Sequence, residues 1–149
     1  MMILIIEDDE HKSSQIVEIF DVVSKDIDNK HIIDNVKDAV IFLVGNIPSK
    51  LILDMSLPSH KALPGQGTPV PMPTGGIEVL FELKKKGLTN MPILILTQYH
   101  EIEIENEPYP VEESAEALKE IYGFTNVQAC YYEHLKNAKW IDITAEFLR

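Results

Sequence analysis

Short apolar runs recur along the chain, and longer amphipathic stretches separate them. The expected strands lie at residues 2–6, 31–33, 51–54, 93–96 and 127–132. A short apolar run between turn residues is typical of a strand that is buried on both faces. The stretches between the runs carry apolar residues at helical spacing, as Ile16, Phe20 and Val23 do after the first run. Strands that alternate with helices in this way predict a parallel sheet covered by helices on both faces.

Capping and turn residues predict where the five helices begin. They are expected to start near Glu10, after Asp34-Asn35, at Gly75-Gly76, near Pro110 and after Asn137. Right-handed crossovers leave few topologies, and the flavodoxin-like strand order 2-1-3-4-5 places the first and third strands side by side. The expected fold is therefore α/β, a flavodoxin-like (βα)5 domain with three α/β/α layers over residues 1–149.

Two stretches fall outside this regular pattern. Residues 59–75 contain four prolines and three glycines, which allow neither a helix nor an interior strand. We predict a long loop insertion there, beside the acidic residues considered next, and its role is left open between a functional loop and an inert one. In residues 98–108, glutamates alternate with Ile102 and Ile104, which predicts either an extended edge segment or an irregular loop.

Two of the predicted strands end in acidic residues. Glu7 and Asp8 follow the first strand, and Asp54 ends the third. Because neighbouring parallel strands present their carboxyl ends at one edge of the sheet, these carboxylates should converge on one crevice. Packed carboxylates raise one another's pKa, and a hard divalent cation such as Mg²⁺ relieves the repulsion. Acids at a helix N-terminus also favour the helix dipole, so the Glu7–Glu10 run has a purely structural explanation as well.

Charge and composition exclude several classes of partner. The chain has 149 residues, a net charge of −11 and a pI near 4.8, which argues against nucleic-acid and anionic-membrane surfaces. Cys130 is the single cysteine, so we expect it to be buried and inert rather than disulfide-bonded. No apolar run approaches the length of a membrane span, and we expect a cytoplasmic protein.

Four motifs, in order along the chain, resemble the receiver domain of bacterial two-component response regulators. They are Ile5–Asp9, Leu51–Pro58, Gly76–Leu80 and Pro92–Thr97. Each motif is modest alone, but together they keep the family's order and cover nearly the whole chain. The resemblance implies a stand-alone receiver, whose output would be contact with a downstream protein; a homodimer is left open.

The resemblance also assigns roles to residues of the acidic crevice. Asp54 would be the nucleophile that takes a phosphoryl group from the phosphohistidine of a histidine kinase or phosphotransfer protein. Asp8 and Asp54 would bind Mg²⁺ directly. Glu7 would act directly or through water, and the backbone carbonyl of Ser56 would add a ligand. Thr97 would bind a phosphoryl oxygen after transfer.

The chain departs from the family pattern at the end of the fifth strand. Receivers carry a lysine there that pairs with the phosphoryl group, and in this chain the position falls on His134, with Lys136 two residues further on. A histidine is only partly protonated near neutral pH, whereas a lysine is a fixed charge. Tyr131 lies where the family has its switch aromatic, and its rotamer would report the state of Thr97. The alternative for Tyr131 is simple packing as a strand residue.

Three functions compete on this evidence. The leading hypothesis is a phosphorylatable receiver, which is no enzyme beyond its own phosphorylation and dephosphorylation. The missing lysine and the long loop favour a second hypothesis, a receiver-like interaction module that is not phosphorylated. A phosphatase of the haloacid dehalogenase type is the third, and it lacks the expected second acid because Ser56 stands at that position.

Overall fold

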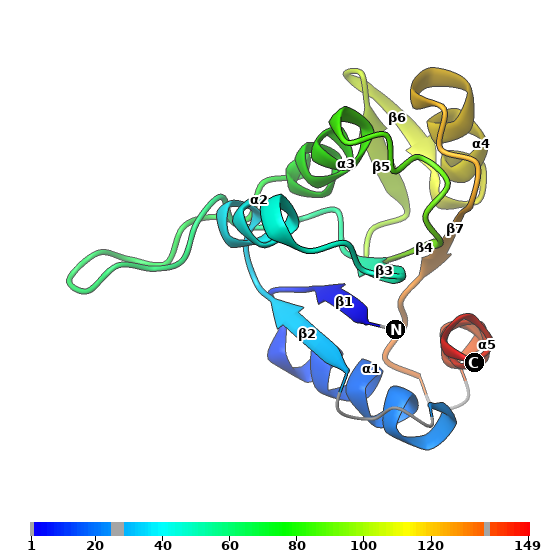
Figure 1. Cartoon of the computed structure of the whole chain (residues 1–149), viewed down its shortest axis with the longest axis horizontal. Helices are drawn as coiled ribbons and strands as arrows, with labels where there is room; N and C mark the ends of the chain where they lie inside the picture. Colours follow the sequence, from blue (N-terminus) through cyan, green and yellow to red (C-terminus); the bar gives the residue numbers. More distant parts are fainter. Residues whose placement is uncertain (1, 25–28, 136–137) are drawn as a thin grey trace.

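The computed structural model describes residues 2–24, 29–135 and 138–149, and its centre is a five-stranded parallel sheet (Figure 1). The strands are β1 (Ile3–Ile6), β2 (Lys30–Ile33), β3 (Lys50–Leu53), β4 (Ile93–Thr97) and β7 (Val127–Tyr131). Their order is β2-β1-β3-β4-β7. The sequence prediction of a flavodoxin-like sheet is confirmed, because β7 is the fifth strand of this sheet.

Alternating side chains of the strands build two cores, one on each face of the sheet. On one face, Leu4 and Ile6 of β1 pack with α2 (Val36–Gly45), α3 (Gly75–Lys85) and α4 (Val111–Tyr122). On the other face, Ile3 and Ile5 pack with α1 (Glu10–Val23) and α5 (Lys139–Leu148). Both faces of the central strands are therefore buried, which explains their continuous apolar runs.

The stretch after β4 forms an antiparallel hairpin of β5 (Glu101–Ile104) and β6 (Glu107–Pro110). Glu105 and Asn106 make its turn with φ values of 53° and 65°, the left-handed conformation of a tight hairpin turn. Ile102 and Ile104 are buried in the core shared with α4, while the glutamates between them are exposed. Of the two alternatives that the alternation left open, an extended segment and an irregular loop, the structure shows the extended segment, and its pairing with β6 was not foreseen.

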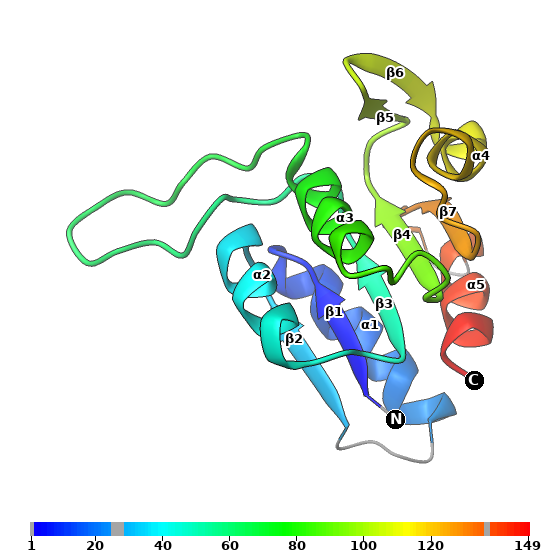
Figure 2. The same cartoon turned by 45° about the horizontal axis from the view of Figure 1, so that its top comes forward.

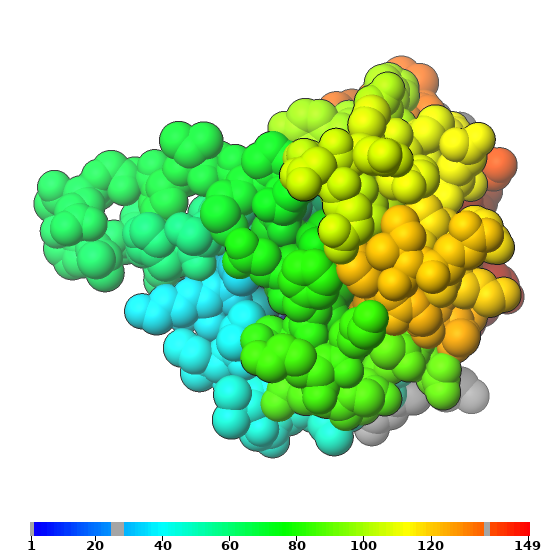
Figure 3. Space-filling model, turned by 90° about the horizontal axis from the view of Figure 1, so that it is seen from above, coloured from blue at the N-terminus to red at the C-terminus, as the bar shows by residue number. Residues whose placement is uncertain are grey.

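Residues 58–74, which we call the arm, run away from the body of the molecule as a long excursion between β3 and α3 (Figures 1 and 2). A pair of backbone hydrogen bonds between Leu57 and Met72 closes its base, at 2.8 and 3.1 Å. Pro58 and Ser59 also accept hydrogen bonds from the first turn of α2. Beyond this base the arm stands apart from the packed body in the space-filling view (Figure 3).

Two glycines let α3 begin directly against the end of β3. A Cβ atom on Gly76 would lie 2.6 Å from Met55 Sδ and 2.7 Å from the backbone oxygen of Asp54. A Cβ atom on Gly75 would lie 2.8 Å from Leu57 Cβ. The Gly76 N–H donates to the Met55 carbonyl at 2.9 Å, so this close approach also holds the turn that carries Asp54.

Most predicted element bounds agree with the structure to within a residue. Asn35 caps α2 through its side chain, Gly123 ends α4 in the left-handed conformation, and Cys130 is buried and free. On α3, Val79 is buried in the core and Phe81 is exposed. The predicted cap Asn137 lies outside the described residues. No helix in the described parts of the chain is long and apolar enough to cross a membrane.

Candidate functional site

The acidic residues that follow β1 and β3 meet at one edge of the sheet. Ile6 pairs with Leu53, and the ladder continues with the Asp54 N–H donating to the Ile6 carbonyl at 3.0 Å. Glu7 in turn donates its N–H to Ile33 of β2 at 2.9 Å. One carboxylate oxygen from each of Glu7, Asp8 and Asp54 lies within 4.8 Å of the others. The predicted convergence of the three acids is therefore what the sheet order produces.

The two carboxylate oxygens of Asp54 have different surroundings. Oδ1 accepts a hydrogen bond from the Met55 N–H at 2.8 Å, which fixes the orientation of the carboxylate. Oδ2 is buried and accepts no hydrogen bond from any described residue. An orphaned buried oxygen is costly for stability and is commonly found where a site awaits a ligand or a reaction.

Lys12 of α1 places its ammonium group among these acids. Its Nζ lies 2.6 Å from Glu7 Oε2, 2.7 Å from the Leu96 carbonyl oxygen and 3.5 Å from Asp54 Oδ2. The side chain is fully buried, as are those of Glu7 and Asp54. Tyr132 closes the other side, with its ring centre 5.2 Å from Nζ. A buried ammonium is stable only when paired, and these polar partners directly follow β1 (Glu7) and β3 (Asp54) or lie in β4 (Leu96).

Sequence reasoning missed Lys12, although a signal for it was present. Lys12 precedes Ile16 by four residues and Phe20 by eight, so all three lie on the buried face of α1. A lysine on the apolar face of a helix, one turn from an acidic run, indicates a buried ion pair. The N-cap of the same helix is Asp9, which accepts the Lys12 N–H at 3.1 Å. Asp9 therefore has a structural task at the helix N-terminus.

Burial dominates the electrostatics of the acidic crevice. Desolvation raises the pKa of Glu7 and of Asp54 above their ordinary values, and the Lys12 ammonium opposes this by lowering both. The Glu7 and Asp54 carboxylates also interact with each other as like charges, which raises the pKa of Glu7 further. The fold thus resists full ionisation of the crevice unless more positive charge enters it.

The donor set fits a hard divalent cation. The three acids offer only oxygen ligands, and Asp54 Oδ2 has no hydrogen-bond donor among the described residues. Lys12 compensates one negative charge of the three when all are ionised, which leaves the charge that one divalent cation would balance. Ser56, the predicted carbonyl ligand, follows Asp54 by two residues and is buried.

Thr97 and Tyr131 are brought together by strand pairing. Thr97 ends β4 opposite Tyr131 of β7, and the Thr97 side chain is fully buried. Thr97 Oγ1 accepts a hydrogen bond from the Tyr99 N–H at 3.1 Å, so its own hydroxyl proton remains free to be donated. The Tyr131 ring stacks on His100 with centroids 4.3 Å apart.

His134 stands at the position of the family's lysine. It is exposed, and its ring contacts Tyr132 at 5.0 Å and His11 at 6.3 Å between centroids. No contact between His134 and Asp54 is recorded among the described residues. Lys136, the other candidate for the family's lysine, lies outside the described part of the chain. Among the described residues, the positive charge next to Asp54 is that of Lys12.

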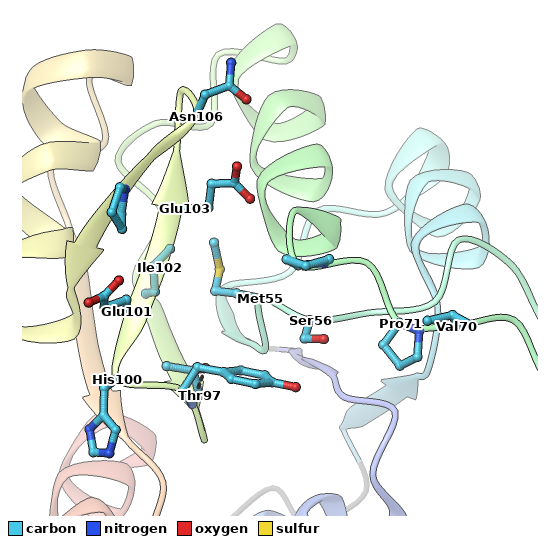
Figure 4. Close-up of a pocket in the computed structure, with 13 residues that line it drawn as sticks. Met55, Ser56, Val70, Pro71, Thr97, His100, Glu101, Ile102, Glu103 and Asn106 are labelled. Atoms are coloured by element: carbon cyan, nitrogen blue, oxygen red, sulfur yellow. Dashed lines mark hydrogen bonds between the residues drawn. The ribbon is translucent and has the colours of Figure 1, made fainter.

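A groove of about 760 Å³ opens beside the acidic crevice. Figure 4 shows it between the hairpin, with Glu101 and Glu103, and the base of the arm, with Pro71. Met55 and Thr97 also line it, so the groove reaches the residues that flank the site. A smaller cleft of about 280 Å³ contains Glu7 and Asp8 and is bordered by Lys61 of the arm. The base of the arm therefore lies beside the acids, as predicted, while its far end points away from them.

Comparison with known proteins agrees with this geometry. No protein-family model matches the chain. Solved structures with the same fold include the receiver domain of the Francisella response regulator 1452, with a TM-score of 0.60 and 17% identity over 99% of this chain and 95% of that one. The Mn²⁺-bound response regulator Rcp1 has a TM-score of 0.61 and 22% identity, over 97% of this chain and 89% of that one. These likenesses show the fold.

The chain belongs to the response regulator receiver family. It is 62% identical over 148 residues to the Detocs response regulatory protein DtcB of Vibrio alginolyticus. That match covers 99% of each chain, so the likeness extends through the arm and the hairpin as well as the sheet. Membership of this family removes the haloacid dehalogenase phosphatase from the hypotheses.

Proposed function

We propose that this chain accepts a phosphoryl group on Asp54 from a phosphohistidine of a histidine kinase or phosphotransfer protein. The observation that carries the proposal is Asp54 Oδ2, a buried carboxylate oxygen at the carboxyl end of β3 with no hydrogen-bond donor among the described residues. The carboxylate is held by Met55 through its other oxygen, so Oδ2 keeps its lone pairs for attack. By likeness to DtcB, the signalling system served would be of the Detocs type.

In the proposed transfer, one bond to phosphorus forms as another breaks. Asp54 Oδ2 attacks the phosphorus, the O–P bond forms and the N–P bond of the phosphohistidine breaks. The electron pair of the broken bond stays on the imidazole nitrogen, which takes a proton from solvent. Positioning and charge neutralisation contribute most of the catalysis in such transfers, and both are properties of the crevice.

Divalent metal binding is part of the same proposal. Glu7, Asp8 and Asp54, with the carbonyl of Ser56, would hold Mg²⁺, which when bound neutralises charge on the phosphoryl oxygens and carboxylates. The Mn²⁺-bound form of Rcp1, which shares the fold, supports a divalent cation at such a site. Thr97 would donate its free hydroxyl proton to a phosphoryl oxygen, and Tyr131 would change rotamer with it.

The first test is intact-mass analysis after incubation with acetyl phosphate and Mg²⁺. We expect one phosphoryl adduct on the wild type, labile to hydroxylamine as an acyl phosphate is, and none on Asp54→Ala or without Mg²⁺. Asp21→Asn is the control, because Asp21 of α1 is an exposed carboxylate that pairs with Lys30 of β2. An adduct that survives in Asp54→Ala would contradict the assignment of the acceptor.

One observation favours the second candidate, a receiver-like module that works without phosphorylation. The arm reaches into solvent and exposes Leu63 and Val70, which suits contact with a partner protein whatever the state of Asp54. Absence of an adduct with any donor, together with no change of Trp140 fluorescence on Mg²⁺ titration, would favour this candidate. Trp140 is a suitable reporter because its ring contacts Tyr132 at 4.8 Å, which in turn covers Lys12.

A further inference from the structure

Lys12 is a buried cation beside the acids, and its geometry points to a role in the chemistry of Asp54. We propose that Lys12 supplies, from helix α1, the positive charge that binds the phosphoryl group on Asp54, in place of the lysine that receivers carry after the fifth strand. This inference rests on the proposed function.

The hydrogen bonds of Lys12 leave one donor for this purpose. An ammonium group has three N–H donors. Glu7 Oε2 at 2.6 Å and the Leu96 carbonyl at 2.7 Å each take one. The remaining donor is left on a nitrogen that lies 3.5 Å from Asp54 Oδ2, too far for a strong hydrogen bond to that oxygen. Lys12 is thus anchored at two points with spare donor capacity next to the attacking atom.

The position of Nζ suits the phosphorylated state better than the free one. Oδ2 is the oxygen that would form the bond to phosphorus, and the other oxygens of the phosphoryl group then lie around it. A nitrogen near Oδ2 but not bonded to it can donate to one of those oxygens with a small side-chain movement. In a buried site such a charge-assisted hydrogen bond is short and strong, because little water competes for it.

The alternative source of positive charge is His134, which stands at the family position. Its side chain is exposed and its recorded contacts in the described structure are with the rings of Tyr132 and His11. Lys12 is buried, its Nζ lies 3.5 Å from Asp54 Oδ2, and it is held by a backbone carbonyl of β4. A fixed point charge of this kind is what phosphoryl binding requires.

The proposal is tested with beryllofluoride, which mimics an aspartyl phosphate, at saturating Mg²⁺. Its affinity is measured by fluorine NMR for the wild type, Lys12→Gln and Lys119→Gln, the last being the same substitution at an exposed lysine of α4. We expect Lys12→Gln to weaken beryllofluoride binding about tenfold or more, as the loss of one charge-assisted hydrogen bond does. Lys119→Gln should match the wild type.

The affinity for Mg²⁺ alone distinguishes the proposed role of Lys12 from a purely structural one. Removing the ammonium also removes the cation that competes for Glu7 and Asp54, so Lys12→Gln should bind Mg²⁺ alone as tightly as the wild type or more tightly, by Trp140 fluorescence. Weaker binding of both Mg²⁺ and beryllofluoride would show a disrupted site and overturn the proposal. A loss of beryllofluoride affinity confined to His134→Ala would overturn it as well.

Two measurements on the wild type complete the test. If Lys12→Gln does not fold, a crystal structure of the wild type with Mg²⁺ and beryllofluoride decides: Nζ within hydrogen-bond distance of a fluorine supports the proposal, and Nζ turned away overturns it. The acetyl phosphate assay separates the two proposals. Beryllofluoride bound through Lys12, with no phosphoryl adduct from acetyl phosphate or from a phosphohistidine donor, would refute the proposed function and keep the role of Lys12 as an anion ligand.

Discussion

The arm and the β5–β6 hairpin both fall outside the regular alternation of strands and helices, yet they fold in opposite ways. The hairpin presses Ile102 and Ile104 into the core beside α4 and ties its turn to that helix. The arm is held by backbone hydrogen bonds at its base and otherwise extends into solvent (Figure 2). Length alone therefore does not decide whether an insertion joins the core.

The difference follows from the residues available to each segment. The hairpin alternates apolar and acidic residues, so one face can be buried while its backbone donors and acceptors pair across the two strands. The arm contains five prolines, which cannot donate backbone hydrogen bonds, and its exposed apolar residues Leu63 and Val70 have no periodic partners. A segment that can neither pair its backbone nor bury a face stays in water.

The largest effect should come from the buried face of the hairpin. Ile104 is fully buried, so Ile104→Ala should lower the free energy of unfolding by about 2–5 kcal/mol through lost burial and a cavity. Leu63→Ala in the arm is the matched control and should change it by less than about 0.5 kcal/mol. Urea denaturation followed by circular dichroism measures both. Equal effects would mean that the arm is as well packed as the hairpin.

The start of α3, directly after the arm, should be far more sensitive to substitution than the arm itself. Gly76→Ala places a methyl group against Met55 and the Asp54 carbonyl, and we expect roughly 1–3 kcal/mol of destabilisation together with slower phosphorylation of Asp54. Gly67→Ala is the control, since nothing lies within 4 Å of its added methyl group. Thermal unfolding and the intact-mass assay give the two readouts. A tolerant Gly76 would refute the close approach of α3 to β3.

The hairpin turn offers a smaller, pH-dependent effect. Tyr122 donates a hydrogen bond to Glu105 at 2.6 Å, and burial together with this acceptor raises the pKa of Tyr122 to about 12. Tyr122→Phe should lower the free energy of unfolding by about 1 kcal/mol. Because the raised pKa means that the folded state retains the proton, this contribution is complete below pH 10 and is lost as the pH rises toward 12. The measurement is the difference in free energy of unfolding between the wild type and Tyr122→Phe, at pH 8 and at pH 11. If the bond did not form, this difference would be the same at both pH values.

The smallest effect is expected from shortening the arm itself. Replacing residues 62–69 by two glycines should change the free energy of unfolding by less than about 0.6 kcal/mol, since loop closure depends weakly on length. Phosphorylation of Asp54 should be unchanged, because Ser59, Lys61 and the Leu57–Met72 pair are kept. Chemical denaturation and intact mass measure the two quantities. A marked loss of stability would reveal contacts of the arm with the body of the molecule.

The fold was predictable because each strand carries its own signal. The apolar runs located the five strands of the parallel sheet to within a residue, and Asn35 was correctly placed at the start of a helix. The hairpin was only half predicted. Its turn residues, Glu105 and Asn106, adopt left-handed conformations. Neither residue type requires that conformation, so the sequence did not indicate a tight turn, and the pairing of β5 with β6 could not be foreseen.

The acidic half of the site follows from the sequence by itself. Glu7, Asp8 and Asp54 come directly after apolar runs, and the strand order that those runs allow places their carboxylates together. This inference needs no side-chain detail, because parallel strands bring their carboxyl ends to one edge of the sheet. The roles predicted for His134 and Tyr131 came from family positions and remain predictions.

The basic half of the site was decided only by the tertiary structure. Lys12 pairs with Glu7 of the nearby acidic run, but its ammonium also lies next to Asp54 at the end of β3 and bonds to the Leu96 carbonyl of β4, far along the chain. A lysine side chain has many rotamers, and its direction depends on charges and desolvation contributed by several segments at once. The direction of the arm also depends on the tertiary structure, because the packed body determines which residues lie near the arm. The sequence thus determined where the negative charge gathers, and the fold determined which cation meets it.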